Sequence, residues 1–432
     1  MQLVKIHCFM LLAVWLATSV AVIATPPDSG RAVVIWISID GVRPDYLDRA
    51  ETPAFDRLRA EGAWSSGLAP VFPSLTFPNH ASQATGVLPG QHGIVMNSFY
   101  DRAAGREFNF PGHPRLLQAE PIWITAERQG RRTAVFDWVH SYGEYAGTTP
   151  AYHADHFRGA LSDRERLQLV LDAWQLDTGS DQPLQLLMGY MMTPDAVGHQ
   201  YGPDSPEIDE TMAQADAELG VFLDEAITLF DERRDPHDQL YVLVTSDHGM
   251  SEVHTVVNPY LLSGLSREEA DSSAAELVTS GNVAQLYLLE ADDAATRRAW
   301  ADTIVERVRE FDFADVYHRA DLPARWGYEH AERTGDVVIV LHTGYTFNRG
   351  AHRVHMPRED INAHLGMHGY DVVDNPEMNG IWVAWRYPQT WGGIEIGPTH
   401  SLQLHATIAD WLGIEPAPAA LQDPIRWGEA TR

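Results

Sequence analysis

The 432-residue sequence predicts an α/β fold with a doubly wound, mostly parallel central sheet and a small α/β insertion that caps it. The first observation behind this prediction is a series of continuous apolar runs of strand length, with helical patterns between them. The second is a change of pattern after about residue 250, where shorter strands and one helix interrupt the alternation. A hydrophobic content of 44% is sufficient for a large core.

Each predicted strand of the central sheet is apolar throughout, as expected for a parallel strand that is buried on both faces. The first run ends in Asp40, and the carboxyl ends of parallel strands are where ligands bind in such sheets. The predicted strands are 31–40 (RAVVIWISID), 133–139 (TAVFDWV), 184–192 (LQLLMGYMM) and 240–247 (LYVLVTSD).

The helices and the insertion follow from periodicity. Apolar residues at helical spacing predict a helix over 207–233, and HSLQLHATIADWLGI predicts a last helix at 400–414. The strand patterns SGNVAQLYLLEADD and TGDVVIVLHTGYTF flank a helical pattern, which predicts the capping insertion. We therefore expect a signal peptide at 1–24, a catalytic core at 25–264 and 364–432, and a cap at 265–363.

The first residues, MQLVKIHCFMLLAVWLATSVAVIATPP, resemble a secretory signal peptide, with Lys5 before an apolar run and a cleavage site after Ala24. The alternative is an uncleaved membrane anchor, because the run approaches spanning length. No second apolar run of that length follows, so we expect no membrane span in the mature chain. The predicted location is periplasmic or extracellular.

Composition excludes several classes of function. Cys8 is the only cysteine and Lys5 the only lysine, and both lie in the leader. A cysteine nucleophile, a disulfide framework, a Walker lysine and a pyridoxal Schiff base are therefore excluded from the mature chain. A formal net charge of −29 argues against binding polymeric nucleic acid. An anionic substrate would need a local cation, and a metal site supplies one. The sequence does not indicate an oligomeric state.

Six potential metal ligands stand at predicted strand ends or beside glycines. Each alone is a weak signal, but three carboxylates and three imidazoles without cysteine suit zinc. Six such ligands and one alkoxide, which Thr76 in PSLTFPNH could supply, divide naturally into two sites. They are Asp40 in ISIDGV, Asp195 and His199 in TPDAVGHQYGP, Asp247 and His248 in TSDHGM, and His368 in GMHGYD.

Local spacing constrains two of these pairs. Asp195 and His199 are four residues apart and share one side of a turn, and the nearby proline and glycines favour a tight loop over a long helix. Adjacent side chains point to opposite faces of a regular strand. Asp247 and His248 can therefore act together only if the chain leaves strand geometry there, which Gly249 would permit.

The ordered motifs DGVRPDYL, PSLTFPNH, HGIVMNSFYD, PDAVGHQYGP, TSDHGM and GMHGYD resemble the nucleotide pyrophosphatase/phosphodiesterase family of the alkaline phosphatase superfamily. The resemblance extends from about residue 32 to ATIADWLGIEPAP. It implies the alkaline phosphatase type of fold, with two Zn²⁺ ions at the carboxyl edge of the sheet. It also implies hydrolysis of a small phosphodiester or nucleotide through a phosphothreonine intermediate.

Carried over to this chain, the resemblance makes Thr76 the nucleophile and places Asn97 beside a phosphate oxygen. Phe77 and Tyr190 match positions that sandwich a base in nucleotide-cleaving members, although core packing is the alternative interpretation. His80 and His92 are interpreted as structural. The implied ligands are Asp40, Thr76, Asp247 and His248 for one zinc, and Asp195, His199 and His368 for the other.

Two departures from the family pattern concern substrate preference. Leu75 stands where many animal members carry a lysine, and AVGH replaces SSGH after Asp195. Neither departure removes a ligand. The alternatives within the superfamily are a lipid or choline-type glycerophosphodiesterase and a phosphomonoesterase or phosphoethanolamine transferase. From another class, a secreted metal-binding protein without catalysis is the remaining alternative.

Overall fold

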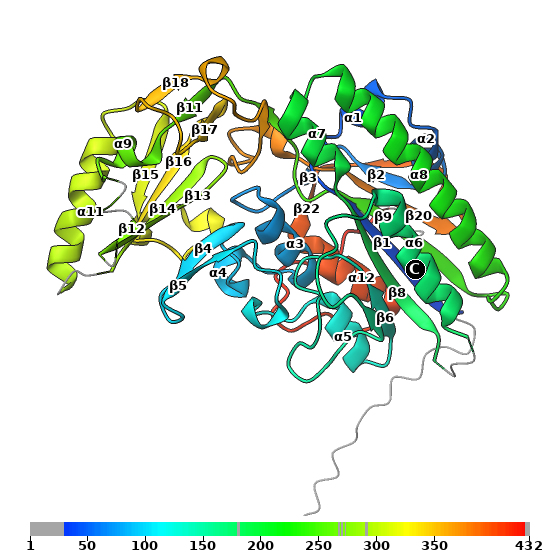
Figure 1. Cartoon of the computed structure of the whole chain (residues 1–432). Coiled ribbons are helices and arrows are strands. Elements are labelled where there is room, and N and C mark those ends of the chain that lie inside the picture. The colour runs from blue at the N-terminus through cyan, green and yellow to red at the C-terminus, as the bar shows by residue number, and fades with distance from the viewer. Residues whose placement is uncertain are drawn as a thin grey trace, which may run out of the picture.

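The computed structural model describes residues 30–178, 182–266, 268, 271–272, 274–289 and 293–427. The predicted signal peptide lies outside these residues. An eight-stranded sheet forms the centre of the larger part of the molecule, in the order β21-β2-β20-β9-β1-β8-β6-β7 (Figure 1). This sheet confirms the predicted fold class.

Five neighbouring strands of this sheet, β9, β1, β8, β6 and β7, run parallel, and β1 lies between β9 and β8. β1 pairs with β8 in the register Val34↔Leu186 and with β9 in the register Val34↔Tyr241. β20 runs antiparallel to β9 and to β2. The strands are β1 (Ala32–Ile39), β2 (Ala63–Ser65), β6 (Arg132–Val135), β7 (Tyr152–His153), β8 (Leu184–Met191), β9 (Gln239–Thr245), β20 (Trp382–Tyr387) and β21 (Ile394–Ile396).

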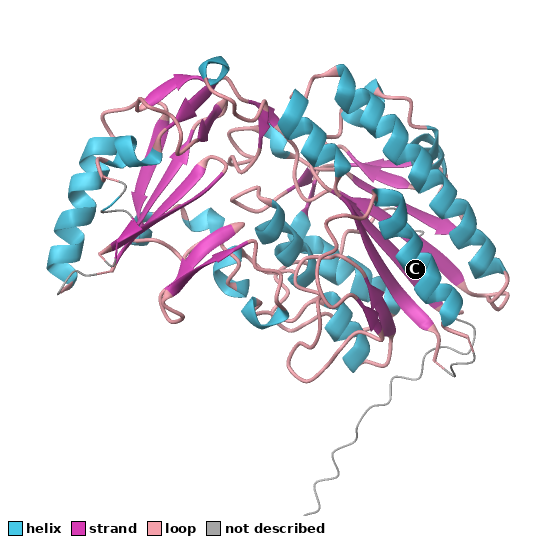
Figure 2. Ribbon diagram, viewed as in Figure 1, coloured by secondary structure: helices cyan, strands magenta, loops and turns pink. Residues whose placement is uncertain are grey.

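Helices cover both faces of the sheet, as Figure 2 shows. On one face, α2 (Pro53–Glu61), α6 (Asp163–Leu176) and α8 (Pro206–Asp231) bury residues against alternate side chains of β1. On the other face, α3 (Thr76–Thr85), α5 (Ile122–Arg128) and α12 (Leu404–Leu412) pack around Trp36 and Trp138. The predicted helices at 207–233 and 400–414 therefore have their counterparts in α8 and α12.

Two local predictions were wrong. The strand expected over 133–139 ends at Val135, because Asp137 has a left-handed backbone with φ of 55°. Asp195 and His199 lie in a helix, α7 (Thr193–Tyr201), instead of a tight loop. Its proline occupies one of the first two helical positions, where the missing N–H costs no hydrogen bond.

The second lobe contains a five-stranded sheet in the order β12-β13-β14-β16-β15 and a three-stranded sheet in the order β17-β11-β18. Its core also contains Val257, Tyr260 and Leu262, which precede residue 265. Its elements are β11 (Thr255–Val257), α9 (Pro259–Ser263), β12 (Asp271–Ser272), β13 (Ala275–Ser280), β14 (Val283–Leu288), α11 (Ala294–Val308), β15 (Ala314–His318), β16 (Val337–Leu341), β17 (Tyr345–Phe347) and β18 (His355–Pro357).

A separate apolar cluster joins this lobe to the segment around α3 and α4. Phe72, Leu75 and Ile94 pack there with Val278 and Val338 of the cap sheet. The cap is therefore fixed directly beside the loop that precedes α3. The remaining elements are α1 (Tyr46–Arg49), β3 (Leu68–Ala69), α4 (Pro89–His92), β4 (Ser98–Asp101), β5 (Arg106–Asn109), β10 (Ser251–Glu252), β19 (Gly366–Met367) and β22 (Thr399–His400).

Among the described residues, no helix has the length and apolar character needed to cross a membrane.

Asp216 of α8 is expected to stabilise the start of α2. Its buried carboxylate accepts hydrogen bonds from the N–H groups of Ala54 (3.0 Å) and Phe55 (2.8 Å), and Thr52 gives this helix no side-chain cap. We predict that Asp216→Ala lowers the free energy of unfolding by about 1–3 kcal/mol in urea titrations at pH 7. Asp224→Ala, which removes only an exposed pair with Arg57, should cost less than about 0.5 kcal/mol. Equal losses in both variants would contradict the capping role.

Candidate active site

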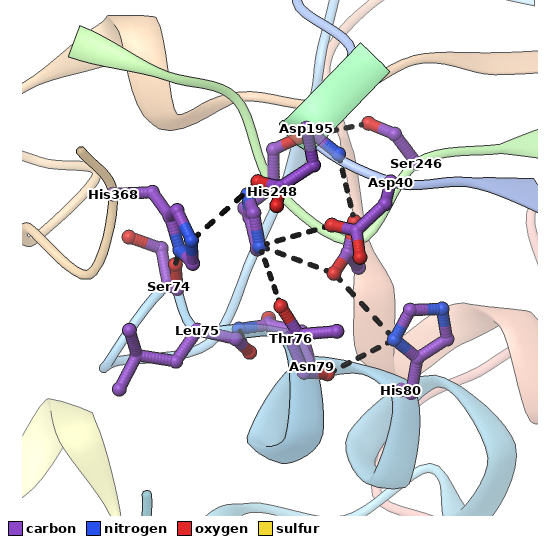
Figure 3. A network of polar contacts seen from close by, with 12 residues as sticks. Asp40, Ser74, Leu75, Thr76, Asn79, His80, Asp195, Ser246, His248 and His368 are labelled. Atoms are coloured by element: carbon purple, nitrogen blue, oxygen red, sulfur yellow. Dashed lines mark hydrogen bonds and ion pairs between the residues drawn. The ribbon is translucent and has the colours of Figure 1, made fainter. Parts of the chain in front are cut away.

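The predicted ligands meet at the carboxyl edge of the central sheet. Asp40 directly follows β1, and Asp247 and His248 follow β9, beyond the point where strand geometry ends. α7 begins after β8 and carries Asp195 and His199. His368 follows β19, and Thr76 is the first residue of α3. Figure 3 shows Thr76, His248, Asp40, Asp195 and His368 facing one another.

The first group consists of Asp40, Asp247 and His248, whose ligand atoms all lie within 4.8 Å of one another. His248 Nε2 is 3.4 Å from Asp40 Oδ1 and 3.2 Å from Asp247 Oδ2. Thr76 Oγ1 is 3.2 Å from the same His248 nitrogen. The nucleophile candidate therefore lies against three potential ligands.

The second group is Asp195, His248 and His368, again within 4.8 Å. His368 Nε2 is 3.6 Å from Asp195 Oδ1, and His199 Nε2 is 3.5 Å from Asp195 Oδ2. The two groups share His248, whereas His199 lies at the outer edge of the second. All six predicted ligands are thus brought to one place.

Backbone carbonyls fix the orientation of the three imidazoles. Nδ1 lies 2.8 Å from the Gly366 carbonyl in His199, 2.9 Å from the Gly249 carbonyl in His248, and 2.9 Å from the Ser74 carbonyl in His368. A carbonyl only accepts, so each Nδ1 carries the hydrogen. Each Nε2 lone pair therefore points into the site, as metal ligation requires.

The carboxylates pass a chemical test for a cation site. Asp40 Oδ1, Asp195 Oδ1 and Asp247 Oδ2 are buried and have no hydrogen-bond partner. Burial raises the pKa values of Asp40 and Asp247 well above the ordinary value of an aspartate. Burial, together with the negative charge of Asp247, raises the pKa of Asp195 to about 8. Three such oxygens are stable as anions only beside positive charge. The donor set therefore fits divalent metal ions.

Burial acts in the opposite direction on the histidines. It lowers the pKa of His248 to about 3 and the pKa of His368 well below its ordinary value, and it lowers the pKa of His199. Neutral imidazoles are the form that binds metals. The protein thus holds these side chains in the protonation state that ligation needs.

A hydrogen-bond network holds Thr76 at the start of α3. Asn79 accepts from the Val71 N–H (2.8 Å) and donates to the carbonyls of Pro73 and Leu75 (2.9 Å each). This network shapes the loop that delivers the threonine. In Figure 3, the Thr76 side chain points toward His248, while Leu75 points away.

His80, which the sequence analysis interpreted as structural, contacts the backbone of Thr76, the predicted nucleophile. Its Nδ1 is 3.0 Å from the Thr76 carbonyl and 3.5 Å from Asp247 Oδ2, and its Nε2 is 2.9 Å from Ser38 Oγ. The signal in the sequence is the four-residue helical spacing from Thr76. His92 instead pairs with Ser82, away from the ligands.

Two further residues position the exit of β9: Ser246 carried no sequence signal, and Gly249 was predicted only to permit a turn. Ser246 Oγ donates to the Val42 carbonyl (2.7 Å) and accepts from the Ile381 N–H (3.1 Å), which fixes the exit of β9. A Cβ on Gly249 would lie 1.9 Å from the Glu377 carbonyl oxygen. Close backbone packing, rather than a turn, therefore requires this glycine.

Asn97 lies next to Thr76. Its Oδ1 accepts a hydrogen bond of 2.9 Å from the Phe77 N–H, which leaves the amide NH₂ group as its donor. Phe77 and Tyr190 both line a cavity of about 570 Å³ that also reaches Thr76, Asp40 and Asp195. The Tyr190 hydroxyl donates a hydrogen bond to Asp40, so Tyr190 both lines the cavity and orients this carboxylate.

A second cavity, of about 420 Å³, opens on the other side of the site. Asn97, His199 and His368 line it together with Thr279 and Ser280 of the cap. Leu75 borders this cavity, but its side chain is 1% exposed and packs in the cluster between the two lobes. The cap therefore covers one side of the site, and the aromatic cavity lies on the other.

The raised carboxylate pKa values predict an unusual pH dependence for metal-free protein. Asp195 has a pKa of about 8 in the folded state and about 3.9 when unfolded. Its stabilising contribution is present at low pH and is lost as pH rises through 8. The histidines, with lowered pKa, oppose this trend only below about pH 6.5.

We therefore predict that chelator-treated protein melts at a lower temperature at pH 8.5 than at pH 7. Adding Zn²⁺ should remove the difference, because the cation neutralises the carboxylates. Asp195→Asn should weaken the dependence in the chelated state, while the raised pKa values of Asp40 and Asp247 keep part of it. Thermal melts at constant ionic strength measure this, and a melting temperature that rises between pH 7 and 8.5 would contradict the analysis.

Comparison with known proteins bears directly on this site. Residues 34–371 match the family model for type I phosphodiesterase / nucleotide pyrophosphatase. The chain is 29% identical over 400 residues to an uncharacterized pyrophosphatase/phosphodiesterase of Schizosaccharomyces pombe, covering 90% of this chain and 78% of that one. It is 28% identical over 403 residues to a bis(5'-adenosyl)-triphosphatase of Bos taurus, covering 91% and 80%.

Solved structures agree with these matches. The structure of an inactive variant of murine ectonucleotide pyrophosphatase / phosphodiesterase 5 in complex with AMP has a TM-score of 0.75 and 25% sequence identity. The similarity covers 90% of this chain and 96% of that one. The family match extends over more than half of the sequence and contains every predicted ligand. The chain belongs to the type I phosphodiesterase / nucleotide pyrophosphatase family of the alkaline phosphatase superfamily.

Proposed function

We propose that this protein is a secreted or periplasmic two-zinc phosphodiesterase that hydrolyses nucleotides through a phosphothreonine intermediate. The observation that carries the proposal is the position of the Thr76 hydroxyl, 3.2 Å from His248 Nε2 between two groups of ligands. A threonine hydroxyl is a weak nucleophile unless a base or a metal ion activates it. The predicted leader and the ectonucleotide relatives support the location.

The residues present would hold two metal ions. Asp40, Asp247, His248 and Thr76 would bind one, and Asp195, His199 and His368 the other. When bound, such ions lower the pKa of a coordinated hydroxyl and offset the charge on the attacking and leaving oxygens. Nitrogen and oxygen donors without cysteine are consistent with zinc.

Thr76 Oγ1 would carry out the covalent step. Its hydroxyl gives its proton to water, and its oxygen attacks phosphorus and forms the phosphothreonine ester, while the bond to the leaving-group oxygen breaks and that oxygen keeps the electron pair. Water then hydrolyses the ester and regenerates the hydroxyl. His80 holds the Thr76 carbonyl and so fixes the start of α3 during both steps.

Asn97 and α3 would stabilise the transferred phosphoryl group. The Phe77 N–H orients Asn97, so its NH₂ group can donate to a non-bridging oxygen. The ten-residue helix α3 begins at Thr76 and directs the positive end of its dipole toward the same oxygens. Neither contact requires a lysine, and the only lysine of the sequence, Lys5, lies in the predicted signal peptide.

A nucleotide is the substrate class that the aromatic cavity favours. Phe77 and Tyr190 flank the route from Thr76 into it, and aromatic faces stack on bases. The bovine relative is a bis(5'-adenosyl)-triphosphatase, and the murine structure contains AMP. Leu75 supplies no charge beside the nucleophile, so we expect weak dependence on the length of a polyphosphate leaving group.

Replacing the nucleophile should abolish turnover. We predict that Thr76→Ala lowers kcat for the p-nitrophenyl ester of adenosine 5'-monophosphate at least about 1,000-fold. Thr76→Ser should keep measurable activity because it keeps the hydroxyl. Thr85→Ala is the matched control, since it removes a buried hydroxyl from the same helix, outside the site. Wild-type turnover by Thr76→Ala would refute the nucleophile assignment.

Metal removal provides a separate test. Chelation should abolish hydrolysis, and Zn²⁺ should restore it with about two ions bound per chain by elemental analysis. His368→Ala should bind about one ion fewer, because it removes a ligand of one group only. The control variant His237→Ala, which changes an exposed histidine, should keep the wild-type metal content. Full activity in protein that is free of metal would exclude the proposed chemistry.

A further inference from the structure

The second cavity of the site, of about 420 Å³, is lined by His199 and His368, and neither of these lines the aromatic cavity. Figure 3 shows His368 on the opposite side of His248 from Asp40. The Thr76 hydroxyl borders the aromatic cavity and lies 3.2 Å from His248 Nε2. In phosphoryl transfer, the attacking and leaving oxygens lie roughly in line on opposite sides of phosphorus. With the nucleoside in the aromatic cavity, the leaving group therefore points into the second one, the polar cavity.

Uncharged hydrogen-bonding side chains from both lobes line much of the polar cavity. They are Asn97, Ser98, Asn109, Thr279 and Ser280.

The rest of this lining offers neither an excess of positive charge nor a broad apolar surface. Glu107 and Arg349 carry opposite charges. Leu75 and Met367 are buried, and Phe110 stands at the boundary with the aromatic cavity, which it also lines. A polyphosphate would need excess cationic groups, and an acyl chain would need apolar walls. The polar cavity is instead suited to a group that carries hydroxyls.

Two hydroxyl groups of the cap line this cavity at the end of β13. The side chains of Thr279 and Ser280 are partly exposed, and within the described part of the chain neither hydroxyl has a hydrogen bond to another protein group. On β5, Asn109 Oδ1 accepts from Ser98 Oγ at 2.7 Å, which leaves the NH₂ group of Asn109 as a donor. The cavity thus presents both donors and acceptors, which are the two roles that a ligand hydroxyl can complement.

The turn that follows these two residues is held against the loop of His368. Gly281 has a φ of 57°, and a Cβ there would lie 2.7 Å from the His368 carbonyl oxygen. The next residue, Asn282, is fully buried, and its Nδ2 donates to the Leu341 carbonyl at 3.1 Å. Close backbone contact therefore fixes the two hydroxyls relative to a potential metal ligand, and such fixed placement is what a specificity site needs.

We propose that the polar cavity is the subsite for a leaving group that carries sugar hydroxyls, and that Thr279 and Ser280 are specificity-determining residues that hydrogen-bond to them. The substrate class is a nucleoside diphosphate whose terminal phosphate is esterified to a sugar. A site built around hydrogen bonds to substrate hydroxyls discriminates against an analogue that lacks them. This inference rests on the proposed nucleotide phosphodiesterase function.

The chemical step is the covalent step of Thr76 applied to this substrate class. The Thr76 oxygen attacks the phosphorus bonded to the nucleoside, and its proton passes to water. The bond from that phosphorus to the bridging oxygen breaks, and the sugar phosphate leaves with the electron pair. Water then hydrolyses the phosphothreonine ester and releases the nucleoside 5'-monophosphate. Only the departing sugar phosphate contacts Thr279 and Ser280.

Four substrates test the subsite with the unmodified holoenzyme. ADP-glucose and ADP-ribose carry sugar hydroxyls on the second phosphate, the β-methyl ester of ADP lacks them, and the p-nitrophenyl ester of AMP lacks the second phosphate as well. We expect kcat/KM for at least one sugar substrate to exceed that for the methyl ester at least about tenfold, since at least two hydrogen bonds are gained. The larger value distinguishes a hexose from a ribose. A smaller ratio for both sugars overturns the inference.

Variants assign the discrimination to the cap hydroxyls. Thr279→Val combined with Ser280→Ala removes both hydroxyls, and we expect the ratio of kcat/KM between the preferred sugar substrate and the methyl ester to fall below about threefold. A higher ratio overturns the assignment. Thr303→Val is the matched control, because it removes an exposed threonine hydroxyl from α11 of the same lobe, outside both cavities. This control should keep the wild-type ratio.

The inference and the proposed function fail differently. If no substrate is hydrolysed, including the p-nitrophenyl ester, the proposed function is wrong. If the p-nitrophenyl ester is hydrolysed but neither sugar substrate is preferred over the methyl ester, only the subsite is wrong. If the double variant does not fold, Ser280→Ala alone should lower the ratio at least about threefold, and a smaller effect overturns the assignment.

Discussion

The structure depends on placing three buried carboxylates within a few ångströms at one edge of a sheet. Asp40, Asp195 and Asp247 each keep an oxygen without a hydrogen-bond partner, and their burial is opposed by desolvation and by mutual repulsion. Such an arrangement is tolerable only where cations offset the charge. The surrounding elements hold these groups in place.

The backbone of the central sheet holds the carboxylates and imidazoles in position. The ligands follow β1, β8 and β9, the three central parallel strands, whose mutual register is fixed by hydrogen bonds. The imidazoles are oriented by backbone carbonyls, and Ser246 ties the exit of β9 to neighbouring segments. Little depends on flexible side chains, so the geometry of the site follows from the packing of the sheet.

The two cavities at the site differ in chemistry, because the first is largely aromatic and the second is lined by polar side chains from both lobes. The aromatic cavity is formed by loops of the central domain, and Tyr190 connects it to the ligands through Asp40. The polar cavity is bounded by the cap. Tyr190 therefore links one cavity to Asp40, whereas His199 and His368 border the other cavity directly.

The sequence by itself determined the fold class, and it predicted a set of six potential metal ligands. Continuous apolar strands, helical periodicity and ordered motifs around Asp40, Thr76, Asp195, Asp247 and His368 are local patterns that can be read along the chain. Only the tertiary structure decided that His248 belongs to both groups and that His80 contacts the backbone of Thr76. It also decided that α7 is a helix. These properties depend on distances between segments that are far apart in the sequence, and on which hydrogen bonds remain unsatisfied after packing.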